Sequence, residues 1–91
     1  MEGDYTSALR YYQWALSIRK MAIGDDDVQT ADTVYNVALV HRHLKDYAAS
    51  AECFEEAAEV FSKVRGESDP DVKDARIQAN RMRQLSEYSS V

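Results

Sequence analysis

Apolar residues recur every three or four positions through four stretches of the chain, which is the spacing of one face of an α-helix. The first stretch, residues 5–22, carries two such stripes with a narrow polar strip between them. One stripe consists of Tyr5, Ala8, Leu9, Tyr12, Ala15 and Leu16. The other consists of Tyr11, Trp14, Ile18 and Met21. A helix with two apolar faces is expected to have packing neighbours on both sides.

The second predicted helix spans residues 27–44. Gly24 suits a left-handed stop at the end of the preceding helix. Asp27 can cap the free amides of the new helix, and the acidic residues 25–27 match the positive end of its dipole. A cation site is the alternative interpretation of three consecutive Asp residues. It is disfavoured, because no further oxygen ligands follow at the spacing of a calcium loop.

The third predicted helix, residues 47–64, follows the second after a junction so short that it predicts a tight helix hairpin. Gly66 marks its end, and residues 69–70, Asp and Pro, form a typical helix start. The fourth predicted helix therefore spans residues 70–85, with one packed and one polar side. Residues 86–91 are predicted to be a flexible tail.

The first and third stretches are copies of one pattern. Residues 3–16 and 45–58 each read Asp-Tyr, a small residue three positions after the Tyr, an aromatic seven after it and an alanine ten after it. The offset between Asp4 and Asp46 is 42 residues. A self-match at one fixed offset is the sequence signature of a repeat array.

Composition and charge exclude several classes of protein. Ninety-one residues allow one small domain, and the net charge of −5 argues against a nucleic-acid-binding surface. The single cysteine, Cys53, rules out an internal disulfide and favours a reducing, cytoplasmic setting. No run of about 18 apolar residues exists, so we expect no membrane insertion. The N-terminal residues lack the pattern of a signal peptide.

No constellation of catalytic or cofactor-binding residues is recognised, so the chain is predicted not to be an enzyme and to need no cofactor or metal. His41 and His43 point about 200° apart on a helix and cannot chelate one metal ion. His41 is expected to fill a packed aromatic position. Cys53 is expected to be a buried, inert thiol. Trp14 and the tyrosines are expected to belong to the core rather than to an aromatic cage.

Two other features allow a binding interpretation beside a simpler one. Residues 89–91 fit the Ser-x-apolar terminus read by domains that add a C-terminal strand to a sheet edge. The fourth helix carries four basic residues, which alternate with Asp74 and do not interleave with aromatic residues. A solvated helix face explains them better than a positive binding patch. These residues are Lys73, Arg76, Arg81 and Arg83.

The two copies resemble the tetratricopeptide repeat family, in the long variety seen in kinesin light chains. The pattern of that family's second helix is matched by Tyr5, Ala8, Tyr12 and Ala15, and again by Tyr47, Ser50, Phe54 and Ala57. The apolar, small and aromatic places of its first helix are held by Val34, Val37, Ala38 and His41. The light-chain linker is matched by Gly66, Pro70, Asp71 and Val72, and its Asn-x-Ala motif by residues 36–38.

The resemblance implies an all-α fold of about four helices, in which antiparallel helix hairpins stack as a right-handed superhelix. Residues 1–85 would hold the second helix of one repeat, one full repeat and the first helix of another, which caps the array. The fourth helix carries Arg76, Asn80 and Arg83 at the positions equivalent to packed residues of the second helix. A following helix would therefore have no small residues there against which to pack closely.

The resemblance also implies a protein–protein interaction scaffold that binds a peptide or partner helix in a concave groove. The first helices of successive repeats, here the second and fourth helices, would line it. The residues expected to contact the partner are Tyr35, Asn36, Leu39, Arg42, His43, Ile77 and Arg81. Asn36 could bond a ligand backbone, and Arg42 and Arg81 could attract a carboxylate. A terminal-carboxylate clamp of the chaperone-tail type is disfavoured, because only Asn36 resembles a member of its Lys, Asn and Arg set.

The alternative hypothesis is a structural self-association module. The first predicted helix lacks a leading partner helix, so its first stripe is expected to be uncovered and to mediate homo-oligomerisation. The residues of this self-association face are Tyr5, Leu9, Tyr12 and Leu16. The second apolar face of the same helix, if nothing else covers it, is also expected to bind another molecule.

Overall fold

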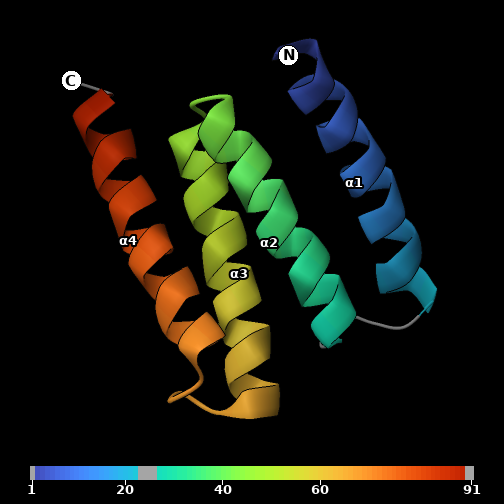
Figure 1. The fold of residues 1–91 in the computed structure, drawn as a ribbon, viewed down its shortest axis with the longest axis vertical. Coiled ribbons are helices and arrows are strands. Elements are labelled where there is room, and N and C mark those ends of the chain that lie inside the picture. Colours follow the sequence, from blue (N-terminus) through green and yellow to red (C-terminus); the bar gives the residue numbers. More distant parts are fainter. Residues whose placement is uncertain (1, 23–26, 90–91) are drawn as a thin grey trace.

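A computed structural model of the chain describes residues 2–22 and 27–89, and most of these residues lie in four α-helices. They are α1 (Glu2–Ala22), α2 (Val28–His43), α3 (Tyr47–Arg65) and α4 (Pro70–Ser89). The helices run in alternating directions, and each packs on the next one in the chain (Figure 1). The predicted all-α class is confirmed.

Helix boundaries follow from local capping. The Asp27 carboxylate accepts hydrogen bonds from the backbone N–H groups of Gln29, at 3.1 Å, and Thr30, at 3.2 Å, which confirms it as the N-cap of α2. Gly66 ends α3 with φ at 90°, a left-handed conformation that glycine adopts without strain. Residues 23–26, where Gly24 was expected to stop α1, lie outside the described residues.

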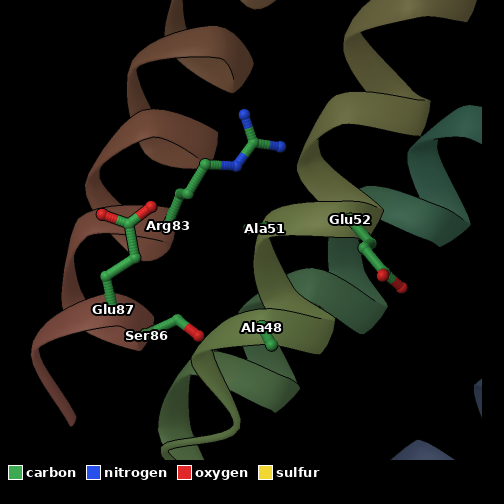
Figure 2. Close-up of a pocket in the computed structure, with 6 residues that line it drawn as sticks. All are labelled: Ala48, Ala51, Glu52, Arg83, Ser86 and Glu87. Atoms are coloured by element: carbon green, nitrogen blue, oxygen red, sulfur yellow. The ribbon is translucent and has the colours of Figure 1, made fainter. Parts of the chain in front are cut away.

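The last helix is longer than predicted. α4 extends to Ser89, so residues 86–89 continue the helix, and the prediction of a tail is wrong over this segment. No glycine or proline follows Leu85 to stop the helix. Its last turns also face α3 across a surface pocket of about 190 Å³ (Figure 2). The pocket is lined by Ala48, Ala51, Glu52, Arg83, Ser86 and Glu87.

The core lies on both sides of α3, which packs between α2 and α4. One buried cluster joins Ala31, Val34, Ala57, Val60, Phe61 and Val72. A second joins Ala38, Ala51, Phe54, Ala79 and Met82. The alanines let the helix backbones approach closely, and the buried Ser50 hydroxyl donates to the Ala38 carbonyl at 2.7 Å. This bond ties α3 directly to the backbone of α2.

Removal of either of two buried hydroxyl groups should change the free energy of unfolding, in opposite directions for the two groups. The Thr30 hydroxyl has no hydrogen-bond partner within the described part of the chain, and such a group costs about 1 to 3 kcal/mol. Thr30→Val keeps the side-chain shape and removes the hydroxyl, so the free energy of unfolding should rise by about 1 kcal/mol in urea denaturation.

Ser50→Ala is the matched variant, because it removes a hydroxyl that is bonded. Its free energy of unfolding should fall by about 1 kcal/mol. A loss of stability in Thr30→Val would contradict the assignment of its hydroxyl as unsatisfied.

Candidate functional site

The first stripe of α1 faces α2 and is not an open surface. Its members Tyr5, Leu9, Tyr12 and Leu16 are all partly buried. The Tyr5 ring stacks on His43 of α2, with centroids 4.5 Å apart and planes at 12°. Leu16 packs against the buried cluster around Val34. The expectation that this stripe lacks a partner is therefore wrong, because the next helix in the chain folds back along this side of α1.

The second stripe of α1 is the exposed one. Tyr11, Trp14, Ile18 and Met21 are all exposed large apolar side chains. Trp14 is 63% exposed, so the expectation that it belongs to the core is wrong. The periodicity of the helix revealed both stripes, but only the direction in which α2 returns decides which one is covered.

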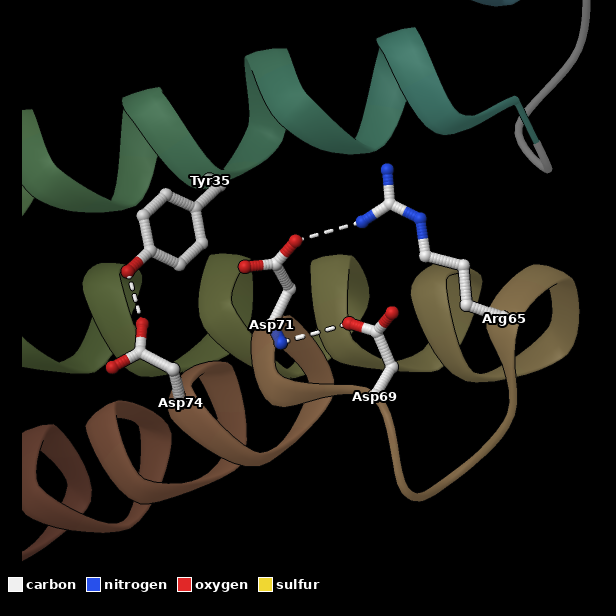
Figure 3. A network of polar contacts seen from close by, with 5 residues as sticks. All are labelled: Tyr35, Arg65, Asp69, Asp71 and Asp74. Carbon is white, nitrogen blue, oxygen red and sulfur yellow. Dashed lines mark hydrogen bonds and ion pairs between the residues drawn. The ribbon is translucent and has the colours of Figure 1, made fainter.

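Two predicted groove residues of α2, Tyr35 and Arg42, reach α4. The Tyr35 hydroxyl donates a hydrogen bond to the Asp74 carboxylate (Figure 3). The Arg42 guanidinium donates to the side-chain oxygen of Gln78 at 3.2 Å. These two bonds cross from α2 to α4 about two helical turns apart along α2. They hold the two helices together along one face, which we call the α2–α4 face. It comprises Asp32, Tyr35, Asn36, Arg42, Asp71, Asp74, Ile77, Gln78 and Arg81.

One end of the α2–α4 face is acidic and aromatic. A cavity of about 180 Å³ there is lined by Asp32, Tyr35, Phe61 and Asp71. Arg65 reaches this region, where its guanidinium lies 4.9 Å from the Phe61 ring centroid and donates to the Asp71 carboxylate at 2.7 Å (Figure 3). Aromatic faces and carboxylates together attract cations, and Arg65 is such a cation held within the chain.

Sequence reasoning missed three residues of this acidic end. None of Phe61, Arg65 and Asp71 was predicted to bind a partner, and Asp71 was matched only to the light-chain linker. They meet because the turn after Gly66 brings the first turn of α4 back beside the last turn of α3, as Figure 3 shows. The short linker with a Gly stop and an Asp-Pro start was the signal that could have placed them together.

The remaining predicted groove residues are placed differently. Asn36, Ile77 and Arg81 are exposed on α2 and α4. Leu39 is partly buried and packs against the cluster around Phe54. His43 stacks on α1 through Tyr5, so it borders the α1 side of α2. The structure thus brings Tyr35 and Arg42 to α4 and directs His43 to a different neighbour.

Tyr35 is the central side chain of the α2–α4 face. Its ring contacts Phe54 edge to face, with centroids 5.2 Å apart, while its hydroxyl is bonded to Asp74. Burial, followed by the hydrogen bond and the negative charge of Asp74, raises the pKa of Tyr35 from 10.0 to about 12. The side chain is therefore a neutral hydrogen-bond donor at physiological pH.

Cys53 and His41, two side chains that could support chemistry, are packed within the fold. Burial and the charges of Glu56 and Glu52 raise the pKa of the Cys53 thiol from 9.0 to about 11. Cys53 is partly rather than fully buried. The His41 side chain is 12% exposed, and its Nδ1 lies 3.9 Å from a carboxylate oxygen of Asp46.

Within the described ranges, no group of three or more His, Cys, Asp or Glu residues could hold a metal ion. Among the same residues, no helix is long and apolar enough to span a membrane.

One family model matches part of the chain. Residues 30–71 match a family model described as a tetratricopeptide repeat. The matched stretch contains most of α2, all of α3 and the start of α4. No curated protein and no solved structure matches the chain. Proteins with such repeats generally act as protein–protein interaction modules and non-catalytic scaffolds.

The raised pKa of Tyr35 should appear as a loss of stability at alkaline pH. In the unfolded chain this phenol titrates near its ordinary value of 10.0, and in the folded chain near about 12. Its contribution is therefore fully present below about pH 10 and lost as the pH rises toward about 12. Urea denaturation across this range should show a smaller decline for Tyr35→Phe than for the parent chain. Parallel declines in the two proteins would contradict the assignment.

The raised pKa of Cys53 should make the thiol unreactive. Alkylation needs the thiolate, and a pKa near 11 instead of 9.0 lowers the thiolate fraction at pH 8 by about 100-fold. Iodoacetamide should therefore react at least about 100-fold more slowly with the folded chain than with the urea-unfolded chain. Ser68→Cys in a Cys53→Ala background supplies an exposed control thiol. Equal rates at the two positions would contradict this account.

Proposed function

We propose that the chain is a protein–protein interaction module that binds an extended peptide segment along the α2–α4 face. The observation that carries the proposal is the charge polarity of this face. Asp32, Asp71 and Asp74 lie toward one end, and Arg42 and Arg81 lie toward the other end of the same two helices. The similarity of residues 30–71 to a tetratricopeptide repeat supports an interaction role over a catalytic one.

The geometry of the helices sets the expected length of the ligand. Asp32 and Arg42 are ten residues apart on α2, which corresponds to about 15 Å along the helix axis. An extended peptide advances about 3.3 Å per residue, so roughly four or five residues cover this span. The preferred ligand therefore carries a Lys or Arg side chain at one end and an acidic side chain or terminal carboxylate four or five residues away.

Each part of the face has a distinct role in this proposal. The ligand's cation enters the cavity beside Phe61 and Tyr35, where it shares or replaces the position of the Arg65 guanidinium. Asn36, exposed in the middle of the face, bonds the ligand backbone through its amide. Ile77, 56% exposed on α4, supplies an apolar contact. Arg42 and Arg81 receive the carboxylate.

Selection from a random dodecapeptide library against the immobilised chain tests the proposal. Enriched peptides should carry a basic and an acidic residue separated by about four or five positions. Asp32→Asn should weaken the selected peptides about tenfold, the loss expected when one charge-assisted hydrogen bond is removed. Arg81→Gln should do the same through the other end. Both effects should diminish at high salt, because the two side chains are exposed.

Arg76→Gln is the matched control, because it removes an exposed charge from α4 at a position that is paired with Glu67, outside the α2–α4 face. It should leave affinity within about twofold. Enrichment of peptides without spaced opposite charges, or equal weakening by Arg76→Gln and Arg81→Gln, would contradict the proposed binding mode.

A further inference from the structure

The exposed stripe of α1 has the spacing of a helix-pairing seam. Tyr11, Trp14, Ile18 and Met21 are 63%, 63%, 48% and 89% exposed, and they follow one another at intervals of three, four and three residues. This is the a/d pattern by which two helices pair with interlocking side chains. At 100° per residue the seam points about 170° away from the stripe that packs on α2, so a second helix reaches it freely.

The chain's own repeat gives a reference for this surface. At the fixed offset, Tyr11 and Ile18 correspond to Cys53 and Val60, which pack against the cluster that joins α3 to α2. This part of α1 is thus equivalent to a helix-packing surface.

Two positions of the seam depart from the repeat. Where α3 carries Glu56 and Lys63, α1 carries Trp14 and Met21. The exposed face of α1 is therefore wider and more apolar than its counterpart on α3. A helix that packed on α1 as α2 packs on α3 would not account for the additional apolar residues.

Head-to-tail stacking of copies does not cover the seam. The helix of the second copy that would meet α1 in a continued array is α4. Its residues Arg76 and Asn80 are exposed and polar, and its Arg83 is paired with Glu55 of α3. Pairing them with an apolar seam would bury charged groups that are now solvated. Of the surfaces that a second copy offers, the seam itself is the one that matches.

We propose that two copies of the chain pair through this seam, with their α1 helices antiparallel about a two-fold axis near residue 16. In this register Tyr11 packs on Met21 of the second copy, and Trp14 packs on Ile18 of the second copy. Each layer thus joins a large aromatic side chain to a smaller aliphatic one, and Tyr11 gains a sulfur–aromatic contact. A two-fold interface must be self-complementary, and this one meets the requirement because each aromatic residue of one copy packs on an aliphatic residue of the other.

The flanks of the seam suit the same arrangement. Beside the axis, Ala15 faces Ala15 of the second copy on one flank, and Ser17 faces Ser17 on the other. The small side chains allow close approach of the helices. The two Arg10 side chains lie about 20 Å apart across the axis, so they do not repel strongly. A parallel pairing would instead stack Trp14 on Trp14, with no size match between layers.

The size of the seam predicts a weak dimer. At about 200 Å² for a fully buried aromatic side chain, the exposed parts of Tyr11 and Trp14 contribute about 250 Å² per copy. With Ile18 and Met21 the interface stays near or below the roughly 1,000 Å² total of a stable complex. The dimer should therefore form at micromolar to millimolar concentration and dissociate on dilution. This inference is independent of the α2–α4 face.

Sedimentation equilibrium and the fluorescence of Trp14, the single tryptophan, test the proposal in the full chain. Raising the concentration should convert monomer to dimer and shift the emission to shorter wavelength, because the indole leaves water. Ile18→Glu should raise the dimer dissociation constant at least tenfold. Ile77→Glu, which charges an equally exposed position on α4, should leave it within about twofold. Circular dichroism confirms that each variant is folded.

Cysteine trapping tests the antiparallel register. In a Cys53→Ala background, Ser17→Cys should oxidise to a covalent dimer, whereas Ser68→Cys, exposed in the turn between α3 and α4, should not. A monomer at all concentrations, or trapping equal at the two positions, would overturn the proposal. So would a shift of Trp14 emission by a synthetic peptide of residues 27–45 while the chain stays monomeric, because that result assigns the seam to an α2-like helix.

Discussion

The close packing of α3 between α2 and α4 is the constraint on which the other features depend. It is possible because small residues, Ser50, Ala51, Ala57 and Ala58, are buried along α3. The Ser50 hydroxyl donates a hydrogen bond to the Ala38 carbonyl. This bond fixes the position of α3 along the axis of α2 as well as the distance between the two helices. Larger residues at these places would force the helices apart and break both buried clusters.

The α2–α4 face is a consequence of this packing rather than a separate device. Because α3 holds both neighbours, Tyr35 of α2 can reach Asp74, and Arg42 can reach Gln78, across the outer side of the three-helix layer. The Tyr35 ring at the same time rests on Phe54 of α3. The Tyr35 side chain thus connects the core to the surface. A change in the spacing of α2, α3 and α4 would therefore also alter the α2–α4 face.

The sequence predicted the helices well because their signals are local. Asp27 and Gly66 act through hydrogen bonds and backbone conformations within a few residues, and the structure agrees with both. The orientation of α1 was predicted wrongly, since Tyr5 and Trp14 lie on stripes that periodicity alone cannot rank. The acidic end was missed because Phe61, Arg65 and Asp71 meet only across the turn between α3 and α4. The Gly stop and Asp-Pro start of this turn were recognised, but no contact was inferred from them.

The two proposed surfaces lie on different helices, which has a consequence for binding strength. The α1 seam points away from α2, so pairing through it leaves the α2–α4 face of each copy open to solvent. A dimer would then present two peptide-binding faces in one particle. A partner with two suitable segments gains an effective concentration for the second contact, which raises avidity without any new contact within each face. Weak pairing through Trp14 would make this gain depend on the concentration of the chain, so capture of a partner would rise more steeply than for a monomer.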